Sequence, residues 1–383
     1  MRCALFYKNC AMDCAVFKIR WFDFVENRYN YIDFLRFIGL SLIILAHVHA
    51  PNIIHQIRCF DVPLMLFVSG LAYGNKDVKS SWKQFYLPRI KKLLIPVYLF
   101  VMIDLAAYII TNRTLSTQTV IRTFFLCEDG AVGYIWIFRV FILIMLVTPF
   151  LSRINRKMSY KRFCIFMLSL YILQWFLVWF MRYISIEPLI SVYRETLPYL
   201  VGYAIPFLLG LRLRQTDKKQ ENAFLITIII VSITVLCLFY IQHHTIIEPT
   251  PYFKYPPRSY YIIYGLFASA ALWKLRHTLN PLANSKLVLF IGRNTIWIYL
   301  WHIVFVTIAN HLFENWLLKY FLTYSLALLF YQIQYTLIKK LRQRTKLDVL
   351  NVFIGWIKEI SLLDNTRNII IDISTIYYTF HPL

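Results

Sequence analysis

The chain has 383 residues, of which 59% are hydrophobic and only 16% are charged. A water-soluble domain has roughly 45–50% apolar and about 25% charged residues, so this chain lacks the polar surface needed to cover itself in water. Its 41 lysines and arginines exceed its 19 acids and give a formal net charge of +22. Because the basic residues lie in short clusters between apolar runs, they indicate membrane topology rather than a nucleic-acid-binding face. The composition therefore predicts an integral membrane protein without a nucleic-acid partner.

About ten apolar segments are long enough to cross the hydrocarbon core of a bilayer, which takes roughly 17–25 residues in a helix. The second segment is short by this measure. We therefore expect an all-α, polytopic membrane protein with about ten transmembrane helices. The approximate limits of the segments are 33–50, 60–74, 93–110, 133–152, 163–181, 197–211, 223–242, 259–273, 287–309 and 316–338.

The connections between these segments alternate in their content of basic residues. One set of alternate connections holds 23 lysines and arginines, whereas the opposite set holds seven. By the positive-inside rule the richer set faces the cytoplasm, which also places both termini inside. The richer connections are 75–92, 153–162, 212–219, 274–286 and 339–346.

This pattern divides the chain into three parts. Residues 1–28 form a cytoplasmic N-terminal segment in which no cleavable signal peptide is evident. Residues 29–346 form the transmembrane domain. Residues 347–383 form a tail to which we assign no span and no role.

The seven cysteines give no sign of a disulfide framework or a metal centre. They are odd in number and lack both a CxxC pair and a histidine at metal-ligand spacing. We interpret them as free thiols and expect no metal.

The first apolar segment carries two polar groups that are costly inside a membrane and persist mainly where they face a cavity or a partner. Arg36 and His47 lie eleven residues apart, which places them on one face of a helix and about 16 Å apart along its axis. A neutral imidazole at the outer end could act as a general base toward a sugar hydroxyl, and Arg36 could hold an anionic or carbonyl group of a cofactor. The alternative is structural: Arg36 extends to the inner interface and His47 caps a helix end.

Further polar residues are expected at the depth of His47 on other helices. Asp61 opens the second segment, Arg139 lies near the outer end of the fourth, and His302 lies two thirds of the way across the ninth. Asp61 or His302 could orient the imidazole, with Arg139 balancing the Asp61 charge. Asp61, Arg139 and Tyr299 are also candidate contacts for an acceptor substrate. The alternative, a purely structural pair of Asp61 and Arg139, stays open at this point.

Two connections carry other candidate contacts. Arg89, Lys91 and Lys92 precede the third segment and suit the phosphates of a nucleotide-like cofactor, although topology alone would also place cations there. The outer connection 248–264 is rich in proline and tyrosine. Its aromatic side chains could stack on sugar rings or form an interfacial belt, and we favour the belt.

These residues resemble the acyltransferase 3 family of integral membrane acyltransferases. The defining pattern of that family is an arginine or lysine separated by ten residues from a histidine in the first helix, which matches Arg36 and His47. The resemblance covers about residues 28–342 and includes three further blocks: Pro63–Gly70 (PLMLFVSG), Arg89–Pro96 (RIKKLLIP) and Gly292–His302 (GRNTIWIYLWH).

The resemblance implies a reaction. Such proteins transfer an acyl group, commonly acetyl from acetyl-coenzyme A on the cytoplasmic side of a bacterial inner membrane, to a hydroxyl of an envelope or exported glycan. His47 would be the catalytic base and Arg36 a partner of the donor. The chain departs from the pattern at Asp61, where many members have histidine, so the role of Asp61 is open. Some relatives continue into an extracytoplasmic domain, for which this tail is too short, so we expect a stand-alone transferase.

The competing hypothesis is a transporter or flippase for a sugar or lipid-linked solute. Such proteins often contain inverted repeats with broken helices at corresponding positions, and the two halves of this chain show no convincing self-similarity. The sequence names neither the acceptor nor the acyl group. We expect direct transfer rather than a covalent enzyme intermediate, because direct transfer requires fewer groups.

The predicted topology can be tested with introduced cysteines. Those near Lys79 and Lys157 should react only with membrane-permeant thiol reagents, because these positions face the cytoplasm. Those near Thr117 and Tyr252 should react with impermeant reagents as well. Labelling of intact cells, read as a mass shift, measures the difference. The opposite pattern would contradict the orientation and with it the side from which a donor enters.

Overall fold

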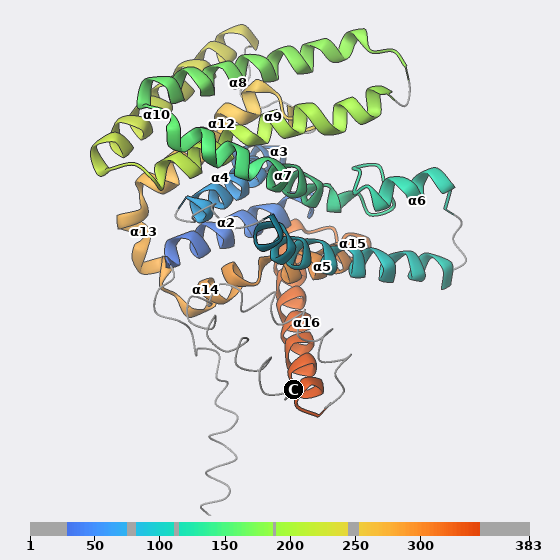
Figure 1. Ribbon diagram of the computed structural model, residues 1–383. Coiled ribbons are helices and arrows are strands. Elements are labelled where there is room, and N and C mark those ends of the chain that lie inside the picture. The colour runs from blue at the N-terminus through green and yellow to red at the C-terminus, as the bar shows by residue number, and fades with distance from the viewer. Residues whose placement is uncertain (1–28, 75–81, 111–114, 187–188, 244–252, 345–383) are drawn as a thin grey trace, which may run out of the picture. The chain divides into compact units, whose positions relative to one another are not determined.

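The protein is built from α-helices, as its sequence predicts. The computed structural model describes residues 29–74, 82–110, 115–186, 189–243 and 253–344, and no β-strand occurs in these ranges (Figure 1). Apart from Tyr29, the described residues belong to one compact unit. The helices are α2 (Asn30–Ala46), α3 (Asn52–Arg58), α4 (Asp61–Tyr73), α5 (Trp82–Ile110), α6 (Thr117–Phe124), α7 (Trp136–Lys157), α8 (Tyr160–Phe180), α9 (Leu189–Leu213), α10 (Lys218–His243), α12 (Ser259–Lys274), α13 (Arg276–Ala283), α14 (Lys286–Arg293), α15 (Thr295–Leu312) and α16 (Trp316–Arg344), with the short 3₁₀ helices η1 (Gly133–Ile135) and η2 (Met181–Tyr183).

Seven helical segments in the described ranges are long and apolar enough to cross a membrane, so the chain is a multi-pass membrane protein. The other three predicted spans correspond to α2, α5 and α12. Of these, α2 and α12 have 17 and 16 residues, close to the minimum that crosses the hydrocarbon core. The count of ten and the cytoplasmic termini stay predictions. The seven segments are Asn52–Tyr73, Gly133–Lys157, Tyr160–Tyr183, Leu189–Leu213, Lys218–Ile241, Thr295–Leu312 and Trp316–Lys340.

The ninth predicted span, 287–309, is wrong as one continuous helix. The chain bends at Asn294, which separates α14 from α15. The side-chain amide of Asn294 donates to the carbonyl oxygen of Phe290 (2.7 Å), and its oxygen accepts from the hydroxyl of Tyr331 (2.6 Å). These bonds satisfy polar groups that the interrupted helix would otherwise leave without partners.

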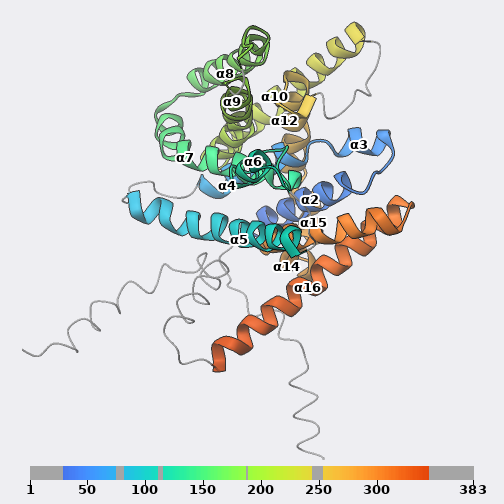
Figure 2. The same ribbon diagram turned by 90° about the vertical axis from the view of Figure 1, so that its right-hand side faces the viewer.

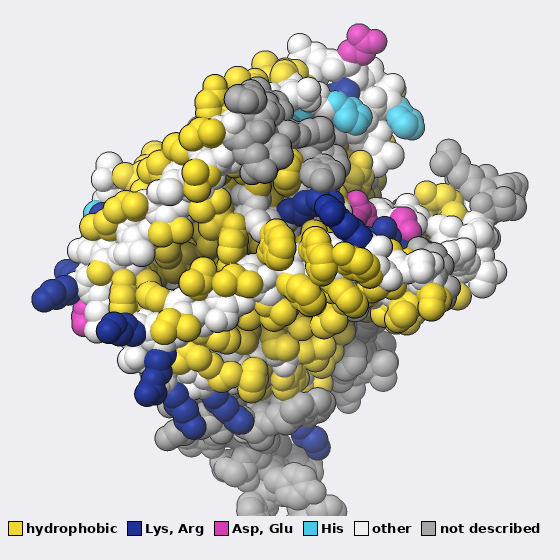
Figure 3. All heavy atoms as spheres, turned by 90° about the horizontal axis from the view of Figure 1, so that it is seen from above, with side chains coloured by type: hydrophobic (Ala, Val, Ile, Leu, Met, Phe, Trp, Pro, Cys, Tyr) yellow, Lys and Arg dark blue, Asp and Glu magenta, His cyan; other side chains and the backbone are white. Residues whose placement is uncertain are grey.

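Helices α2 and α4 occupy the middle of the helix assembly. α4 packs against α9, α2 and α12, and α2 also packs against α14 and α15. Both views place α8, α9, α10 and α12 on one side of this pair and α5, α14, α15 and α16 on the other (Figures 1 and 2). α9 is mostly buried, whereas most of α8, α10 and α16 is exposed. Hydrophobic side chains cover most of the face in Figure 3 and leave Lys and Arg in a few groups, as expected of a surface in contact with lipid.

Helices α4 and α9 approach each other backbone to backbone at two glycines. A methyl group on Gly70 would lie 2.0 Å from the carbonyl oxygen of Phe207, and one on Gly210 would lie 2.0 Å from that of Phe67. Small residues permit such close approach of helices in a membrane. The contact fixes the position of α4, which begins at a candidate site residue.

Some predictions concern residues that the structure does not describe. The terminal segments 1–28 and 347–383 are among them, as are two of the labelling positions, Lys79 and Tyr252. The other two labelling positions lie in described helices, because Thr117 begins α6 and Lys157 ends α7.

The contact between α4 and α9 predicts a difference between two glycine substitutions. Gly70→Ala should destabilise the protein by about 1–3 kcal/mol, because the new methyl group meets a backbone carbonyl that cannot move aside. Gly39→Ala is the control, since its methyl group would meet the flexible side chain of Met65. Thermal unfolding in detergent measures both. Equal stability of the two variants would contradict the tight packing of α4 on α9.

Candidate active site

His47 and His302 are in direct contact, although 255 residues separate them in the sequence. α2 ends at Ala46 rather than near residue 50 as predicted, and His47 lies in the turn that follows. There the side chain of Asn310, on α15, donates to the backbone carbonyl oxygen of His47 (2.9 Å). Nδ1 of His47 lies 3.1 Å from Nε2 of His302, which is hydrogen-bond distance.

The surrounding hydrogen bonds assign the protons of both rings. Nδ1 of His302 faces the backbone carbonyl oxygen of Tyr299, which can only accept, so this nitrogen carries a proton. Nε2 of a neutral His302 is then an acceptor, and it accepts from Nδ1–H of His47. Nε2 of His47 is left with a lone pair. His302 is fully buried, whereas residue His47 is half-buried and lies in the turn that follows α2.

Two tyrosines enclose the histidine pair. The ring centre of Tyr134 lies 4.2 Å from that of His47, and the ring centre of Tyr299 lies 4.6 Å from that of His302. The Tyr299 hydroxyl donates to the backbone carbonyl oxygen of Tyr134. Tyr299, predicted as an acceptor contact, therefore uses its hydroxyl within the protein and holds Tyr134 against His47.

Asp61 is the centre of a buried charge cluster. It is 1% exposed, and its carboxylate accepts from Nη1 of Arg58 at 2.8 Å and from Nζ of Lys254 at 3.0 and 3.2 Å. The backbone N–H of Val62 also donates to it (2.8 Å). Both cations lie close enough to His47 to act on it electrostatically. In the described chain Asp61 makes no hydrogen bond to His47, so it acts on the imidazole through the cations it holds.

Lys254 shows that the belt interpretation of connection 248–264 is wrong for its described part. This side chain is 5% exposed, and its Nζ lies 5.6 Å from the ring centre of Trp136. Tyr255 packs edge to face on the same indole with ring centres 5.0 Å apart. The segment from residue 253 therefore folds into the interior, where Asp61 compensates the buried lysine charge.

Arg139 pairs with Glu195 and not with Asp61. One carboxylate oxygen of Glu195 accepts from Nη1 of Arg139, and the other accepts from Nη2 of Arg122. The predicted pair of Asp61 and Arg139 is wrong, because each group meets other partners. Nε and Nη2 of Arg139 are buried and have no partner in the described chain. This guanidinium can therefore still donate to an incoming acceptor group.

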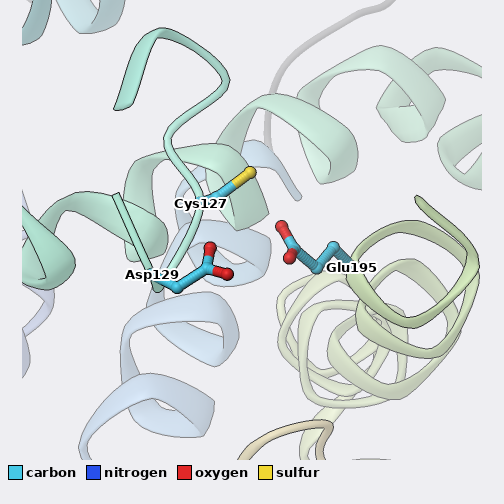
Figure 4. A group of neighbouring side chains, drawn as sticks. All are labelled: Cys127, Asp129 and Glu195. Atoms are coloured by element: carbon cyan, nitrogen blue, oxygen red, sulfur yellow. The ribbon is translucent and has the colours of Figure 1, made fainter. Parts of the chain in front are cut away.

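Cys127, Asp129 and Glu195 bring possible metal-ligand atoms within 4.8 Å of one another (Figure 4). Metal binding would require a deprotonated thiol and available carboxylates. Burial, with Glu195 beside it, raises the pKa of the Cys127 thiol to about 12. Asp129 and Glu195 are both engaged by Arg122, and Glu195 also by Arg139. The group fits an internally neutralised ion cluster better than a cation site.

At the other end of α2, a buried carboxylate sets the position of Arg36. Nη1 of Arg36 donates to one oxygen of Asp33 (2.8 Å), and Nε of Arg293 donates to the other (3.1 Å). Asp33 is fully buried, whereas the side chain of Arg36 is 24% exposed. α14 lies so close here that a methyl group on Gly292 would be 2.0 Å from the carbonyl oxygen of Asp33. Arg36 is thus held in place by Asp33, while part of its side chain stays exposed.

Arg89 belongs to the same basic region. Its Nε donates to the hydroxyl of Tyr73 at 2.5 Å, and Arg36 lies close enough to act electrostatically on that hydroxyl. Lys91 and Lys92 follow on α5 and are partly buried. The structure therefore groups Arg89 with Arg36 and separates both from the histidine pair at the opposite end of α2.

Comparison with known proteins identifies the family. A family model described as an acyltransferase domain matches residues 29–333, most of the chain. The chain belongs to the acyltransferase 3 family. It is therefore a membrane acyltransferase. No curated protein and no solved structure shows significant similarity to it.

The acyltransferase has site residues that sequence reasoning missed. Asp33 precedes Arg36 by three residues and Arg58 precedes Asp61 by three, and opposite charges at this spacing are a recognised signal of a pair. Lys254 gave no such signal, because its partner lies 193 residues away.

The Asp61 cluster predicts which substitutions unfold the acyltransferase. Asp61→Asn should destabilise it by about 3–5 kcal/mol, because two buried cations lose their counter-charge. Lys254→Met should cost less, since Asp61 keeps Arg58, and adding it to Asp61→Asn should restore part of the lost stability. Unfolding in detergent measures all three variants. Wild-type stability of Asp61→Asn would contradict the cluster.

Proposed function

We propose that the protein moves an acyl group, in the simplest case acetyl, from a coenzyme A thioester to a hydroxyl of an envelope or exported glycan. The observation that supports this most directly is the hydrogen bond between His47 and His302, which leaves a lone pair on Nε2 of His47 in a chain of an acyltransferase family. The proposed location is a bacterial cytoplasmic membrane, with the donor inside and the acceptor outside. The reaction as proposed uses no metal.

In the proposed reaction His47 is the general base. Its Nε2 takes the proton of the acceptor hydroxyl while the oxygen attacks the thioester carbonyl carbon. The tetrahedral intermediate collapses, the carbon–sulfur bond breaks, and the departing coenzyme A thiolate takes the proton from His47. Throughout, Nδ1–H of His47 keeps its bond to Nε2 of His302, which orients the ring and stabilises the imidazolium. The acyl group passes directly to the acceptor.

The cations around Asp61 support the same step. Arg58 and Lys254 carry two positive charges against one negative charge on Asp61. A positive excess in a desolvated site favours the oxyanion that develops on the thioester oxygen. Asp61, whose two oxygens are occupied, positions these cations and does not contact the acceptor. Arg139, with two buried nitrogens that lack a partner, is the proposed acceptor contact.

The donor is proposed to bind at the opposite end of α2. Arg36 presents an accessible side there, and Arg89 is held beside it through Tyr73. Together with Lys91 and Lys92 these groups supply charge for the carbonyl and phosphate groups of coenzyme A. Family membership favours this enzyme over the transporter hypothesis, which would need neither a base nor a thioester.

Replacing His47 tests the proposed function. His47→Ala should lower the transfer of labelled acetyl from acetyl-coenzyme A at least about 100-fold, because a general base contributes roughly 10²–10⁴ in rate. Its size-exclusion profile in detergent should match the wild type. Solute uptake into proteoliposomes without transfer or thioester hydrolysis would support a transporter instead. A near wild-type rate for the variant would remove His47 from the mechanism.

Two replacements of His302 separate orientation from packing. His302→Gln can still offer an oxygen to Nδ1–H of His47, whereas His302→Phe keeps a ring without an acceptor. The Phe variant should lose more kcat than the Gln variant, and both should keep the KM for the donor, since only the chemical step is affected. Equal losses would reduce His302 to a packing residue.

A further inference from the structure

Arg139 keeps one complete edge of its guanidinium without a partner in the described chain. Its Nη1 donates to Glu195, whereas its Nε and Nη2 are buried and bind no protein acceptor there. These two nitrogens lie on the same side of the planar group, so their N–H bonds point in nearly the same direction. Such a pair of donors is the fork with which arginine binds two oxygens of one anion side by side.

The neighbours of Arg139 hold this edge in a fixed orientation. The ring centre of Tyr199 lies 5.3 Å from the guanidinium carbon of Arg139. Glu195 also accepts from Arg122, so its carboxylate is held from α6 and α7 at once. Figure 4 shows Glu195 projecting from α9 toward the turn that carries Asp129. A ligand would therefore meet two donors that are oriented before it binds, which lowers the entropic cost of binding.

The inner part of this cluster holds more positive than negative charge. Arg122 and Arg139 both pair with the buried carboxylate of Glu195, which gives two positive charges and one negative charge. The other charged groups beside them are exposed, so water screens their fields. One further negative charge would therefore balance the inner group. The exposed neighbours are Asp129 and Arg194, with side chains 56% and 42% exposed, and Glu128.

The free edge of Arg139 belongs to the same end of α7 that reaches His47. Tyr134, whose ring packs on His47, precedes Arg139 by five residues, and η1 leads directly into α7. Five residues advance a helix by roughly 8 Å. A hydroxyl at Nε2 of His47 and an anionic group at Arg139 can therefore belong to the same sugar residue or to two adjacent ones.

We propose that the acceptor is an acidic glycan, and that its singly charged carboxylate or phosphodiester group binds to Nε and Nη2 of Arg139. This inference rests on the proposed function and adds the class of acceptor. A neutral sugar offers hydroxyl oxygens but not the missing charge. The side chain of Arg139 is 11% exposed, so the cluster borders the surface, and the groups that cover the two nitrogens have to shift when the anion binds.

Binding of simple anions to the full-length protein in detergent tests the inference without turnover. The probes are glucuronate, its neutral counterpart glucose, and dimethyl phosphate as the phosphodiester, all at the same ionic strength. Thermal stabilisation as a function of probe concentration gives an apparent Kd. Arg139→Lys is the test variant, because lysine keeps the charge beside Glu195 but lacks the fork. Arg194→Lys is the matched control, since this half-exposed side chain lies 3.8 Å from the same carboxylate.

One of the two anions should stabilise the wild type, glucose should not, and the effective anion identifies the source of the charge. Arg139→Lys should bind that anion at least about tenfold more weakly, because it loses a charge-assisted hydrogen bond, whereas Arg194→Lys should match the wild type. Absence of stabilisation of the wild type by either anion, or equal binding by the two variants, would overturn the inference. If Arg139→Lys does not fold, the comparison of each anion with glucose in the wild type decides.

His47→Ala separates this inference from the proposed function. The variant should bind the anion as the wild type does, because His47 acts in the transfer step and not at the guanidinium. Anion binding by a wild-type protein that transfers no acyl group would keep the anion site and reject the proposed reaction. Acyl transfer by a wild-type protein that binds neither anion would keep the reaction and reject the acidic acceptor.

Discussion

A carboxylate buried inside a membrane protein requires a cation, and three carboxylates of this acyltransferase each pair with at least two. Desolvation makes an isolated buried charge cost several kcal/mol, so each group persists only because its partners are in place. The three groups must therefore form together with the packing that brings their members within reach. They are Asp33 with Arg36 and Arg293, Asp61 with Arg58 and Lys254, and Glu195 with Arg122 and Arg139.

These groups also determine where the helices lie. The Asp33 group joins α2 to α14, and the Asp61 group joins α4 to the segment that precedes α12. The Glu195 group joins α9 to α7 and to α6. His47 follows α2 and His302 lies on α15, so the contact between them depends on α2 being fixed at both of its ends. The interactions that satisfy buried charge are therefore the ones that bring together the residues of the proposed active site.

Much of this arrangement could be predicted from the sequence, because hydropathy and charge report on local segments. Apolar length identified the seven segments that are long and apolar enough to cross a membrane, and the polar residues Arg36, His47 and His302 stood out in the apolar runs. The pairing of groups could not be predicted where partners are far apart, as with Lys254, which lies 193 residues from Asp61. Arg139 was given the wrong partner for the same reason, since the carboxylate nearest to it comes from α9. The bend at Asn294 was missed because the apolar runs on its two sides add up to one segment of spanning length, although the polar residues Arg293, Asn294 and Thr295 interrupt that segment.

The first two groups leave more positive than negative charge at the two ends of α2. In the proposed reaction this excess lets Arg36 and His47 act together although they lie about 16 Å apart along the helix. At the inner end, Asp33 uses only one nitrogen of Arg36, so the planar guanidinium can hold its carboxylate and a ligand at once. A lysine could supply the charge, but its ammonium lacks the planar set of N–H donors with which arginine can bind a carboxylate on one side and a ligand on another. At the outer end, the positive excess on Arg58 and Lys254 lies beside His47, the proposed base. The proposed donor can thus be held by charge at one end of α2 while its thioester reacts near the other, with the helix itself fixing the distance.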